Sequence, residues 1–511
     1  MKMVKSAFLA SAAGLVAMSG AQAADLPVKA KPVEYVKVCS LYGAGFFYMP
    51  GTDICLKIGG YVRYQMGYGG GSITAGPFSG AEGTGTRVGT HDFSQRVRTI
   101  ATFDTRQQTA YGTLRTYLIL GYTHDTNANQ GSPLPAGALT PPYFTRGFIQ
   151  IAGFTFGKAT SFYDFASTAA SAYNAGYLMG SSDTGDFGWI GAWYTAQLGN
   201  GVSTTFGIEQ SRRGQTVYLP GATTATVFSG AFSSTANQGN AVNQTTGLPD
   251  VVGNIRVDQA WGAAQVAAAA HNVNASYYGI GTGGGSVGSP AFNEANGHPG
   301  DAWGWAVSGG LRLNAPMIGP GDYFQAQVNY TEGAIRYASG VGGTSAYLNK
   351  WKGNQFAFGQ LTDATFSGTA AAGNSIDLTT AWSVFAAYEH FWTPSLRTSI
   401  YGSYLDVSYN ASATAAFCAR VASAIPGGGG AGCTPSFSTW QIGSRSQWNI
   451  TKDLYVGVDV LYSKFQSASI GSSGAQIGTG SLPSGKGPGF YTNADQDSVN
   501  VTWRVHRDFI P

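Results

Sequence analysis

Five arginines in the first third of the chain lie at positions from which they could act together on charged solutes. They are Arg63, Arg96, Arg98, Arg115 and Arg146, and each lies in a segment where apolar and polar residues alternate. A guanidinium stays charged at physiological pH and holds a rigid geometry. If these side chains lined one wall of a narrow, water-filled space, they would form a basic ladder that focuses an electric field into it.

Three carboxylates could supply the opposite sign. The sequence FTFGKATSFYDF ends at Phe165, and a loop from about Ala166 to Phe187 would follow it. This loop would carry Asp183 and Asp186, with Asp164 at its entrance. Carboxylates that face arginines across water create a transverse field, which orients dipolar solutes and penalises apolar ones. The plainer interpretations are solvated arginines away from the narrowest point and, for the two loop aspartates, an ordinary turn.

The elements that must position these side chains are strands with two unlike faces. Residues 56–68 read LKIGGYVRYQMGY, in which the even positions are mostly apolar and the odd positions mostly polar or small. A period of two indicates a strand. A soluble sandwich would turn the apolar face inward, whereas a transmembrane barrel would turn it toward lipid and would point Lys57 and Arg63 into its lumen.

The same alternation recurs along the whole chain. The clearest further segments are 94–105, 111–122, 454–462 and 498–509, and weaker ones lie near 146–152, 188–198, 202–210, 261–271, 303–313, 323–330, 381–391, 396–404 and 440–448. Long Gly/Ser/Thr/Ala/Asn-rich connections occupy 69–90, 124–142, 214–250, 280–300, 338–376, 405–436 and 466–494. Short turns that alternate with long loops, with aromatics near segment ends, are typical of outer-membrane barrels. We therefore predict an all-β fold, a transmembrane antiparallel barrel of about sixteen strands with its polar face inward, which leaves an aqueous channel.

The N-terminus has the pattern of a secretory signal peptide. Lys2 and Lys5 precede an apolar run, which is followed by the small-residue sequence Ala21-Gln22-Ala23. We predict a signal peptide over residues 1–23 and a single transmembrane β-barrel domain over residues 24–511. The apolar run is too short to cross a bilayer, and no later run reaches ~18 apolar residues, so no transmembrane helix is expected.

Composition narrows the class of protein. Charged residues make up only 11% of the chain, against roughly 25% in ordinary globular proteins. The formal net charge falls from +3 to +1 when Lys2 and Lys5 leave with the signal peptide, which gives no indication of a nucleic-acid partner. The six histidines are scattered and no Cys-x-x-Cys occurs, so we predict no metal site and no cofactor. Cys39 with Cys55 and Cys418 with Cys433 are candidate disulfides for an oxidising compartment, with free thiols as the alternative.

Residues 24–63, ADLPVKAKPVEYVKVCSLYGAGFFYMPGTDICLKIGGYVR, closely resemble the start of the alphaproteobacterial porin family found in Rhizobium-like and Brucella-like bacteria. The resemblance continues through YGTLRTYL (111–118) and GFIQIAGFTFGKATSFYDF (147–165) and returns in the final strands. It implies a sixteen-stranded homotrimeric porin, integral to the bacterial outer membrane, whose third external loop folds inward and narrows the pore.

We therefore predict a non-enzymatic porin for passive diffusion of small hydrophilic solutes and ions, with outer-membrane lipid and lipopolysaccharide around it. A substrate-specific channel of the same fold is the alternative, and Tyr61, Tyr117 and Phe148 permit it. An outer-membrane hydrolase would need a clustered Ser and His with an orienting group. The single GxSxG match, residues 284–288, lies inside the Gly-rich connection 280–300 and not at the end of an alternating segment, so it does not have the context of a nucleophile elbow. An adhesive barrel, with long loops for host or phage contacts, also remains open.

Overall fold

The computed structural model describes residues 38–510 with gaps. The gaps are 70–77, 79–80, 83–92, 126–141, 166–172, 174–177, 183–187, 213, 220–237, 240–247, 276, 279–294, 296, 341–346, 369–374 and 478–485. The signal peptide predicted over residues 1–23 lies outside the described residues, and the division of the chain at residue 23 stays a prediction. Among the described residues, no helix is both long and apolar enough to cross a membrane.

Sixteen described strands form one closed antiparallel barrel. They are β2 (Cys55–Tyr68), β4 (Phe93–Thr109), β5 (Gly112–Asp125), β6 (Tyr143–Ile151), β7 (Phe154–Ala159), β8 (Trp189–Gly199), β9 (Val202–Glu209), β12 (Asp250–Gln259), β13 (Gly262–Val273), β14 (Ala302–Asn314), β15 (Tyr323–Glu332), β20 (Thr380–Phe391), β21 (Leu396–Ser408), β22 (Phe437–Asn449), β23 (Leu454–Gln466) and β26 (Gln496–Ile510). Each pairs with its neighbours along the chain, and β2 pairs with both β4 and β26, which closes the barrel. The predicted fold class is confirmed.

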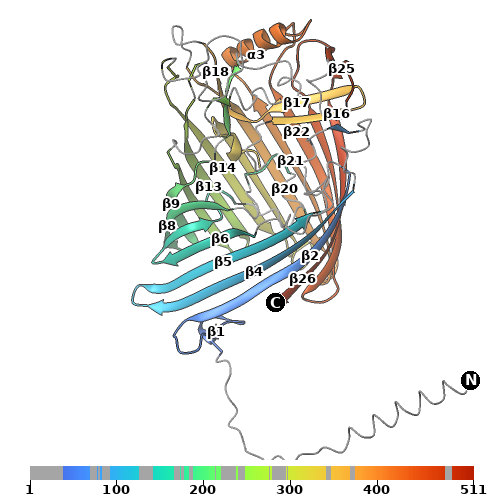
Figure 1. Ribbon diagram of the computed structural model, residues 1–511. Coiled ribbons are helices and arrows are strands. Elements are labelled where there is room, and N and C mark those ends of the chain that lie inside the picture. The colour runs from blue at the N-terminus through green and yellow to red at the C-terminus, as the bar shows by residue number, and fades with distance from the viewer. Residues whose placement is uncertain are drawn as a thin grey trace, which may run out of the picture.

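The two ends of the barrel are unlike. Short turns join the strands at one end, as at Asn200-Gly201 between β8 and β9, where both residues have positive φ. Two successive positive φ angles suit the primed turns that close hairpins. The strands of a cap and α3 (Ala411–Ala424) lie at the other end, while β1 (Phe47–Tyr48) and the C-terminus lie at the short-turn end (Figure 1).

The alternating pattern is oriented as the sequence predicted. In β2, Ile58 and Val62 are 41% and 47% exposed on the outside of the barrel, while Gln65 on the opposite face is only 1% exposed. The same holds in β4, where Val97 is 44% exposed between two inward arginines. Apolar residues face outward because the barrel is built for a surrounding that is itself apolar.

The described parts of the long connections form a cap that shares a buried apolar cluster with the barrel wall, to which Val407, Phe437 and Phe465 contribute. A five-stranded sheet contains β3 (Ala81–Glu82), β16 (Tyr347–Lys352), β17 (Gln355–Gln360), β24 (Gly474–Ile477) and β25 (Gly489–Asn493), and a four-stranded sheet contains β10 (Gln215–Tyr218), β11 (Gln238–Gly239), β18 (Thr362–Phe366) and β19 (Asp377–Leu378). Two short 3-10 helices, η1 (Ser40–Tyr42) and η6 (Ile335–Tyr337), complete the described elements. Trp351, Phe356 and Phe417 belong to a large buried apolar cluster in this cap. The cap is therefore a packed structure and not a set of separate loops.

Helix α3 shows why the cap packs. Asn410 Oδ1 accepts a hydrogen bond from Ala413 N at 2.8 Å and so caps the first turn. Phe417 and Val421 lie four residues apart on one buried face of the helix. The glycine cluster 427–430 lies in the connection predicted over 405–436 and packs against this helix, with Gly429 N donating to Ile470 O at 2.8 Å. Glycine is required at position 429, because a Cβ there would lie only 2.5 Å from Ala422 Cβ and Cys418 O.

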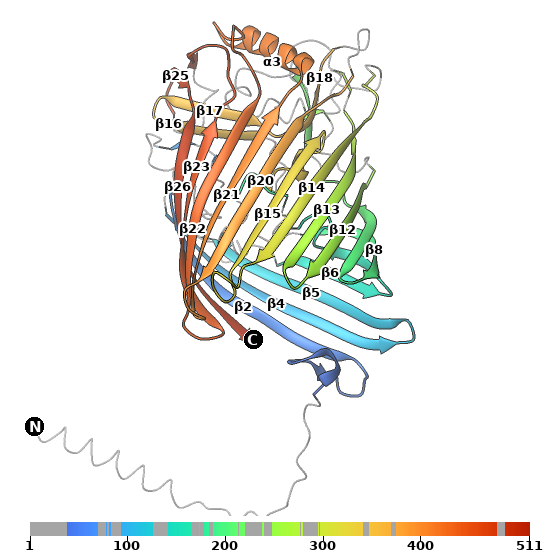
Figure 2. The ribbon, with the colours of Figure 1, turned by 180° about the vertical axis from the view of Figure 1, so that it is seen from behind.

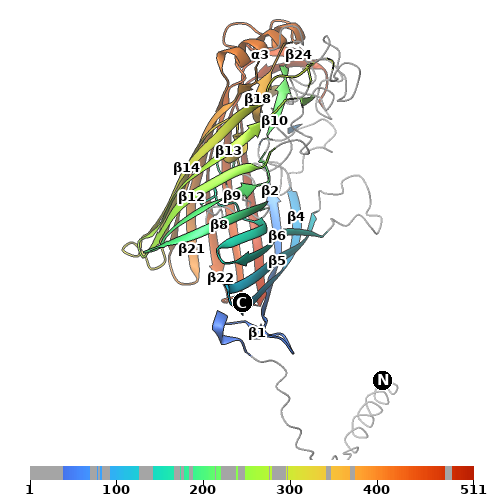
Figure 3. The same ribbon diagram turned by 90° about the vertical axis from the view of Figure 1, so that its left-hand side faces the viewer.

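The barrel wall has unequal height. Strands β14, β20 and β21 rise well above β4 and β5 (Figure 2), and β6 and β8 end lower than β13 and β14 (Figure 3). The cap stands over the tall wall. Both predicted disulfides are present, Cys39–Cys55 beside the start of β2 and Cys418–Cys433 between α3 and the segment that follows it.

Candidate functional site

The five arginines named from the sequence share one wall of the lumen. They lie on β2, β4, β5 and β6, on the face opposite the outward apolar residues. Register places Arg63 directly opposite Arg98 across β2 and β4. Arg146 lies opposite Ile119 across β5 and β6, beside a bulge that follows Ile119. Neighbouring strands therefore bring together side chains that are up to 83 positions apart in the sequence.

Two carboxylates in the same wall were not singled out from the sequence. Arg96 forms a bidentate pair with Asp125, with Nε–Oδ1 at 2.5 Å and Nη2–Oδ2 at 2.9 Å. Asp104 is held between Arg115, at 3.0 Å to each oxygen, and Arg106, whose Nη2 lies 2.9 Å from Oδ2. The alternation of polar and apolar residues that indicated the arginines also places these two aspartates on the polar face of their strands. On β2, β4, β5 and β6 the inward face thus carries six guanidiniums against two carboxylates.

The segment after β7 folds into the barrel along the far wall. Asn254 Nδ2 of β12 donates to Phe162 O at 2.6 Å, and Gln265 Nε2 of β13 donates to Tyr163 O at 3.1 Å. Phe165 N then donates to Gln327 Oε1 of β15 at 3.1 Å. Backbone groups that leave a β ladder are thus satisfied by amide side chains of the wall.

Glycine makes room for this segment. A Cβ at Gly310 of β14 would lie 2.2 Å from the ring of Phe165, so only glycine lets that ring lie against the wall. At Gly457 of β23 a Cβ would lie 1.8 Å from Tyr173 Oη. Two positions without side chains, on strands far apart in the sequence, are therefore shaped to receive aromatic residues of one loop.

Tyr173 is a loop residue that contacts both β23 and β26. Its backbone N donates to Asp459 Oδ2 at 2.7 Å, and its carbonyl accepts a hydrogen bond from Arg504 Nη2. The guanidinium of Arg504 lies 4.0 Å from the centroid of the Tyr173 ring. Farther on, Met179 N donates to Gln441 Oε1 of β22 at 2.7 Å. The loop therefore crosses from β7 to β22, β23 and β26 and is fastened there.

Arg212 locks both ends of the loop. Its guanidinium is fully buried and pairs with Asp164 at 3.0 Å and with Glu209 at 3.2 Å, while Nη1 also donates to Ser182 O at 3.2 Å. The ring of Tyr337 lies 4.4 Å away. Burial opposes the charge, but the carboxylates of Asp164 and Glu209 outweigh it and raise the pKa of Arg212 above its ordinary range. The sequence showed this residue only as one member of an Arg-Arg pair.

The three acidic residues predicted for the loop do not confirm the expected acidic side of the pore. Asp164 lies where the loop leaves β7, but its carboxylate is 3% exposed and is paired with Arg212 of the wall behind it. Asp183 and Asp186 lie outside the described residues. The described part of the loop contacts β12–β15 and β22–β26, of which β26 is the direct neighbour of β2, and its base also accepts a hydrogen bond from Arg146 at Thr160. The acidic half of the transverse field stays a prediction.

A cavity of ≈ 600 Å³ lies between the basic wall and the base of the loop. Arg115 and Arg146 line one side, and Phe162 and Arg256 line the other. Arg146 Nε donates to Thr160 Oγ1 at 3.1 Å, which fixes its head at the edge of the loop. The cavity thus has fixed positive charges on both of its sides.

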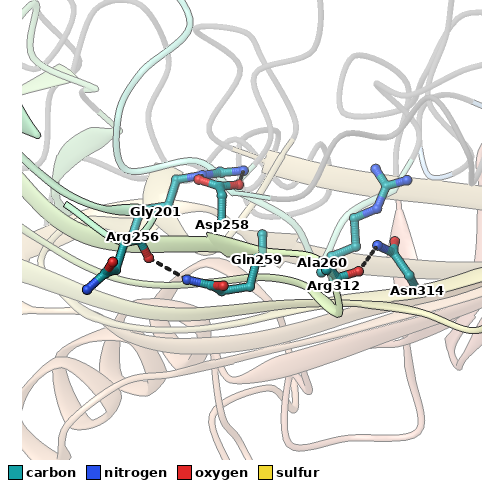
Figure 4. A pocket seen from close by; sticks show the side chains of 10 residues that line it. Gly201, Arg256, Asp258, Gln259, Ala260, Arg312 and Asn314 are labelled. Atoms are coloured by element: carbon teal, nitrogen blue, oxygen red, sulfur yellow. Dashed lines mark hydrogen bonds and ion pairs between the residues drawn. The ribbon is translucent and has the colours of Figure 1, made fainter.

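A second cavity of ≈ 830 Å³ opens at the short-turn end and shares Arg256 with the first. Arg256 pairs with Asp258 at 2.8 Å, and Arg312 lies 4.1 Å from the ring of Tyr323. Figure 4 shows Arg256 and Arg312 extending to the same side of the strands, above the turn at Ala260. Charged side chains thus continue from the loop toward this mouth.

Comparison with known families decides the identity. The family model described as the porin subfamily matches residues 25–498. The chain belongs to the porin subfamily. As such a porin it is an integral β-barrel of the bacterial outer membrane.

Two curated porins from Brucella melitensis show the relationship in detail. Porin Omp2b is 35% identical over 265 residues, 51% of this chain and 63% of the Brucella protein. Porin Omp2a is 36% identical over 222 residues, 40% of this chain and 56% of that protein. The matched region therefore covers less than two thirds of these relatives. Among solved structures, the outer membrane channel DcaP of Acinetobacter baumannii has the same fold, with a TM-score of 0.54 at 13% identity over 90% of this chain and 99% of that one.

Proposed function

We propose that this porin is a water-filled channel for passive diffusion of small hydrophilic solutes and ions across the outer membrane. The observation that carries the proposal is the polar, charged inner wall facing an inward-folded loop across a cavity of ≈ 600 Å³. A barrel of sixteen strands is wide enough to leave an aqueous passage, where an eight-stranded barrel would be filled by side chains. The role involves no catalysed reaction.

The charge of the inner wall bears on which ions pass. Six guanidiniums and two carboxylates on β2, β4, β5 and β6 leave a net positive surface beside the cavity. In a narrow space with low-dielectric walls this surface concentrates anions. We therefore propose that the channel favours anions over cations, and that the arginines contribute the positive side of a transverse field.

The working form of this channel is proposed to be a homotrimer in the outer membrane, surrounded by phospholipid and lipopolysaccharide. Membership of the porin subfamily supports this assembly, and closed rotational symmetry would let identical subunits meet around a common axis. Burial of part of each outer wall against its neighbours would stabilise the three subunits together.

Single-channel recording in planar bilayers tests the conduction, and a KCl gradient tests the selectivity. We expect discrete current steps that grow with salt concentration, and a reversal potential whose sign indicates that chloride crosses more easily than potassium. Protein that inserts as a folded barrel but carries no current would overturn the proposal. A reversal potential of the opposite sign would reject the anion preference and leave the channel role standing.

A further inference from the structure

The cavity beside the loop contains aromatic rings as well as guanidiniums. Tyr117 of β5 and Phe148 of β6 are direct cross-strand partners, with ring centroids 5.4 Å apart and planes at 35°. Both face the cavity and are half-buried. Two adjacent aromatic rings give no advantage to a channel whose wall only has to be hydrated, because polar side chains are hydrated better than aromatic rings.

The register of β5 and β6 places this ring pair between two basic positions. Arg115 lies opposite Gln150, Tyr117 opposite Phe148, and Ile119 opposite Arg146. Alternate residues on a strand are spaced about 6.6–7 Å apart. The inward face therefore presents a guanidinium, an aromatic pair and a second guanidinium in succession. The guanidinium of Arg115 lies 5.0 Å from the Tyr117 ring and 5.5 Å from the Phe148 ring.

The balance of charge around the cavity favours an anion. Its described lining contains three guanidiniums, those of Arg115, Arg146 and Arg256, and one carboxylate, that of Asp164. Asp164 is paired with Arg212, behind the cavity wall. Asp104 accepts from Nε and Nη2 of Arg115, whose Nη1 donates to the neutral Gln150 Oε1 at 3.2 Å. Asp258 accepts from Nε and Nη2 of Arg256.

We propose that this patch is a binding subsite for small aromatic carboxylates on the permeation path. The ring of the solute lies on Tyr117 and Phe148, and its carboxylate reaches Arg146 or Arg115. Offset or tilted ring contacts supply the first part and charge-assisted hydrogen bonds the second. The inference rests on the proposed channel function, because it places the subsite where solutes cross the membrane. It makes the channel selective among anions by shape and not by charge alone.

Benzoate and cyclohexanecarboxylate are matched probes, since both carry one negative charge at neutral pH and have similar size. Chloride current through the purified protein in bilayers should fall as either acid is added. The concentration of benzoate that halves the current should be about threefold to tenfold lower than that of cyclohexanecarboxylate, the range that an aromatic contact supplies. Equal half-blocking concentrations of the two acids would overturn the subsite.

Variants separate the rings from the charge. Phe148→Leu and Tyr117→Leu should raise the half-blocking concentration of benzoate to that of cyclohexanecarboxylate, while Tyr117→Phe should keep the difference. Arg146→Gln should raise the half-blocking concentrations of benzoate and cyclohexanecarboxylate by the same factor. The control is Phe144→Leu, an aromatic on the same strand that is 51% exposed on the outside of the barrel. If Phe144→Leu raised the half-blocking concentration of benzoate as much as Phe148→Leu does, the rings in the lumen would not be the cause of the preference for benzoate.

Calorimetric titration of the detergent-solubilised protein with benzoate distinguishes this inference from the channel function. Binding that Phe148→Leu weakens supports the subsite whether or not current flows. Normal chloride current with no benzoate binding overturns the subsite and leaves the channel. Benzoate binding to a barrel that carries no current overturns the channel and leaves the subsite.

Discussion

At the scale of residues, the arginines of the inner wall have different partners and should differ in effect. Arg96 is matched by Asp125, and Arg115 shares Asp104 with Arg106. Arg98 Nε donates to the neutral Thr123 hydroxyl at 3.0 Å. Because Arg98 lies on the inward face of β4, directly opposite Arg63 of β2, a change of charge at this position acts on ions that pass along the basic wall.

Replacing Arg98 by Gln should therefore shift the reversal potential in a KCl gradient toward cation preference, with near-normal barrel yield. The physical reason is that the variant removes one positive charge from a wet wall and leaves a side chain that can still bond to Thr123. Arg507→Gln is the matched control, because Arg507 lies on β26, faces outward and is 68% exposed. An equal shift in both variants would show that the selectivity comes from overall charge and not from the inner wall.

Arg212 should hold the loop in place. Arg212→Met leaves the buried Asp164 and Glu209 without their cation, and removing one partner of a buried pair costs about 3–5 kcal/mol. Because these groups lie at the base of the loop, we expect a barrel that still assembles but shows frequent, variable current steps in bilayer recordings. Adding Asp164→Asn and Glu209→Gln to the same variant should restore a steady current, since the unpaired charges are then removed. Steady wild-type current in Arg212→Met would contradict this role.

At the scale of elements, the strand faces can be tested by a one-residue change of register. Val97 and Leu114 lie on the outer face of β4 and β5, next in sequence to the inward Arg98 and Arg115. Val97→Arg with Leu114→Arg should cost roughly 2–4 kcal/mol per residue near the membrane midplane and impair assembly, because the charges would face lipid. Arg98→Glu with Arg115→Glu should still assemble and should make the pore more cation-selective. The yield of heat-modifiable barrel on gels measures the first effect and the reversal potential the second.

The cap depends on its own disulfide. Cys418–Cys433 closes a loop with a sequence separation of 15 residues, for which the chain-entropy estimate is about 3 kcal/mol. In the Cys418→Ser, Cys433→Ser variant we expect protease cleavage within residues 411–436, while the barrel keeps its resistance to heat in detergent. The two parts should separate in this way because the barrel is closed by its own ladder between β2 and β26. Loss of heat resistance together with cleavage would show that cap and barrel unfold as one unit.

At the scale of the whole molecule, the barrel should be stable as an assembly of three. Unheated protein in SDS is expected to run as an oligomer and to collapse to a monomer on boiling, because the interface between outer walls would be apolar and shielded from detergent. Light scattering in mild detergent gives the number of subunits. A monomer at every protein concentration in mild detergent would count against the trimer.

Much of this molecule could be read from local patterns. Alternation fixes which side of each strand meets lipid, since successive side chains on a strand point to opposite faces. For that reason the inward direction of Arg63, Arg98 and Arg115 could be predicted without any knowledge of strand neighbours. Of the sixteen barrel strands, β7 and β12 were not singled out, because β7 has only six residues and β12 adjoins a long loop. The short strands of the cap were not predicted either, since they lie within segments that were assigned to connections.

What only the tertiary structure decided are the contacts between segments distant in sequence. Nothing near residue 164 or 212 indicates that Asp164 and Arg212 meet, and nothing near Gly457 indicates that it receives Tyr173, because these contacts exist only once the barrel has closed. The same holds for Tyr117 and Phe148, which become one aromatic surface through the register of β5 and β6. Local periodicity sets the direction of a side chain, while its neighbours depend on closure, register and the path of the loop through the lumen.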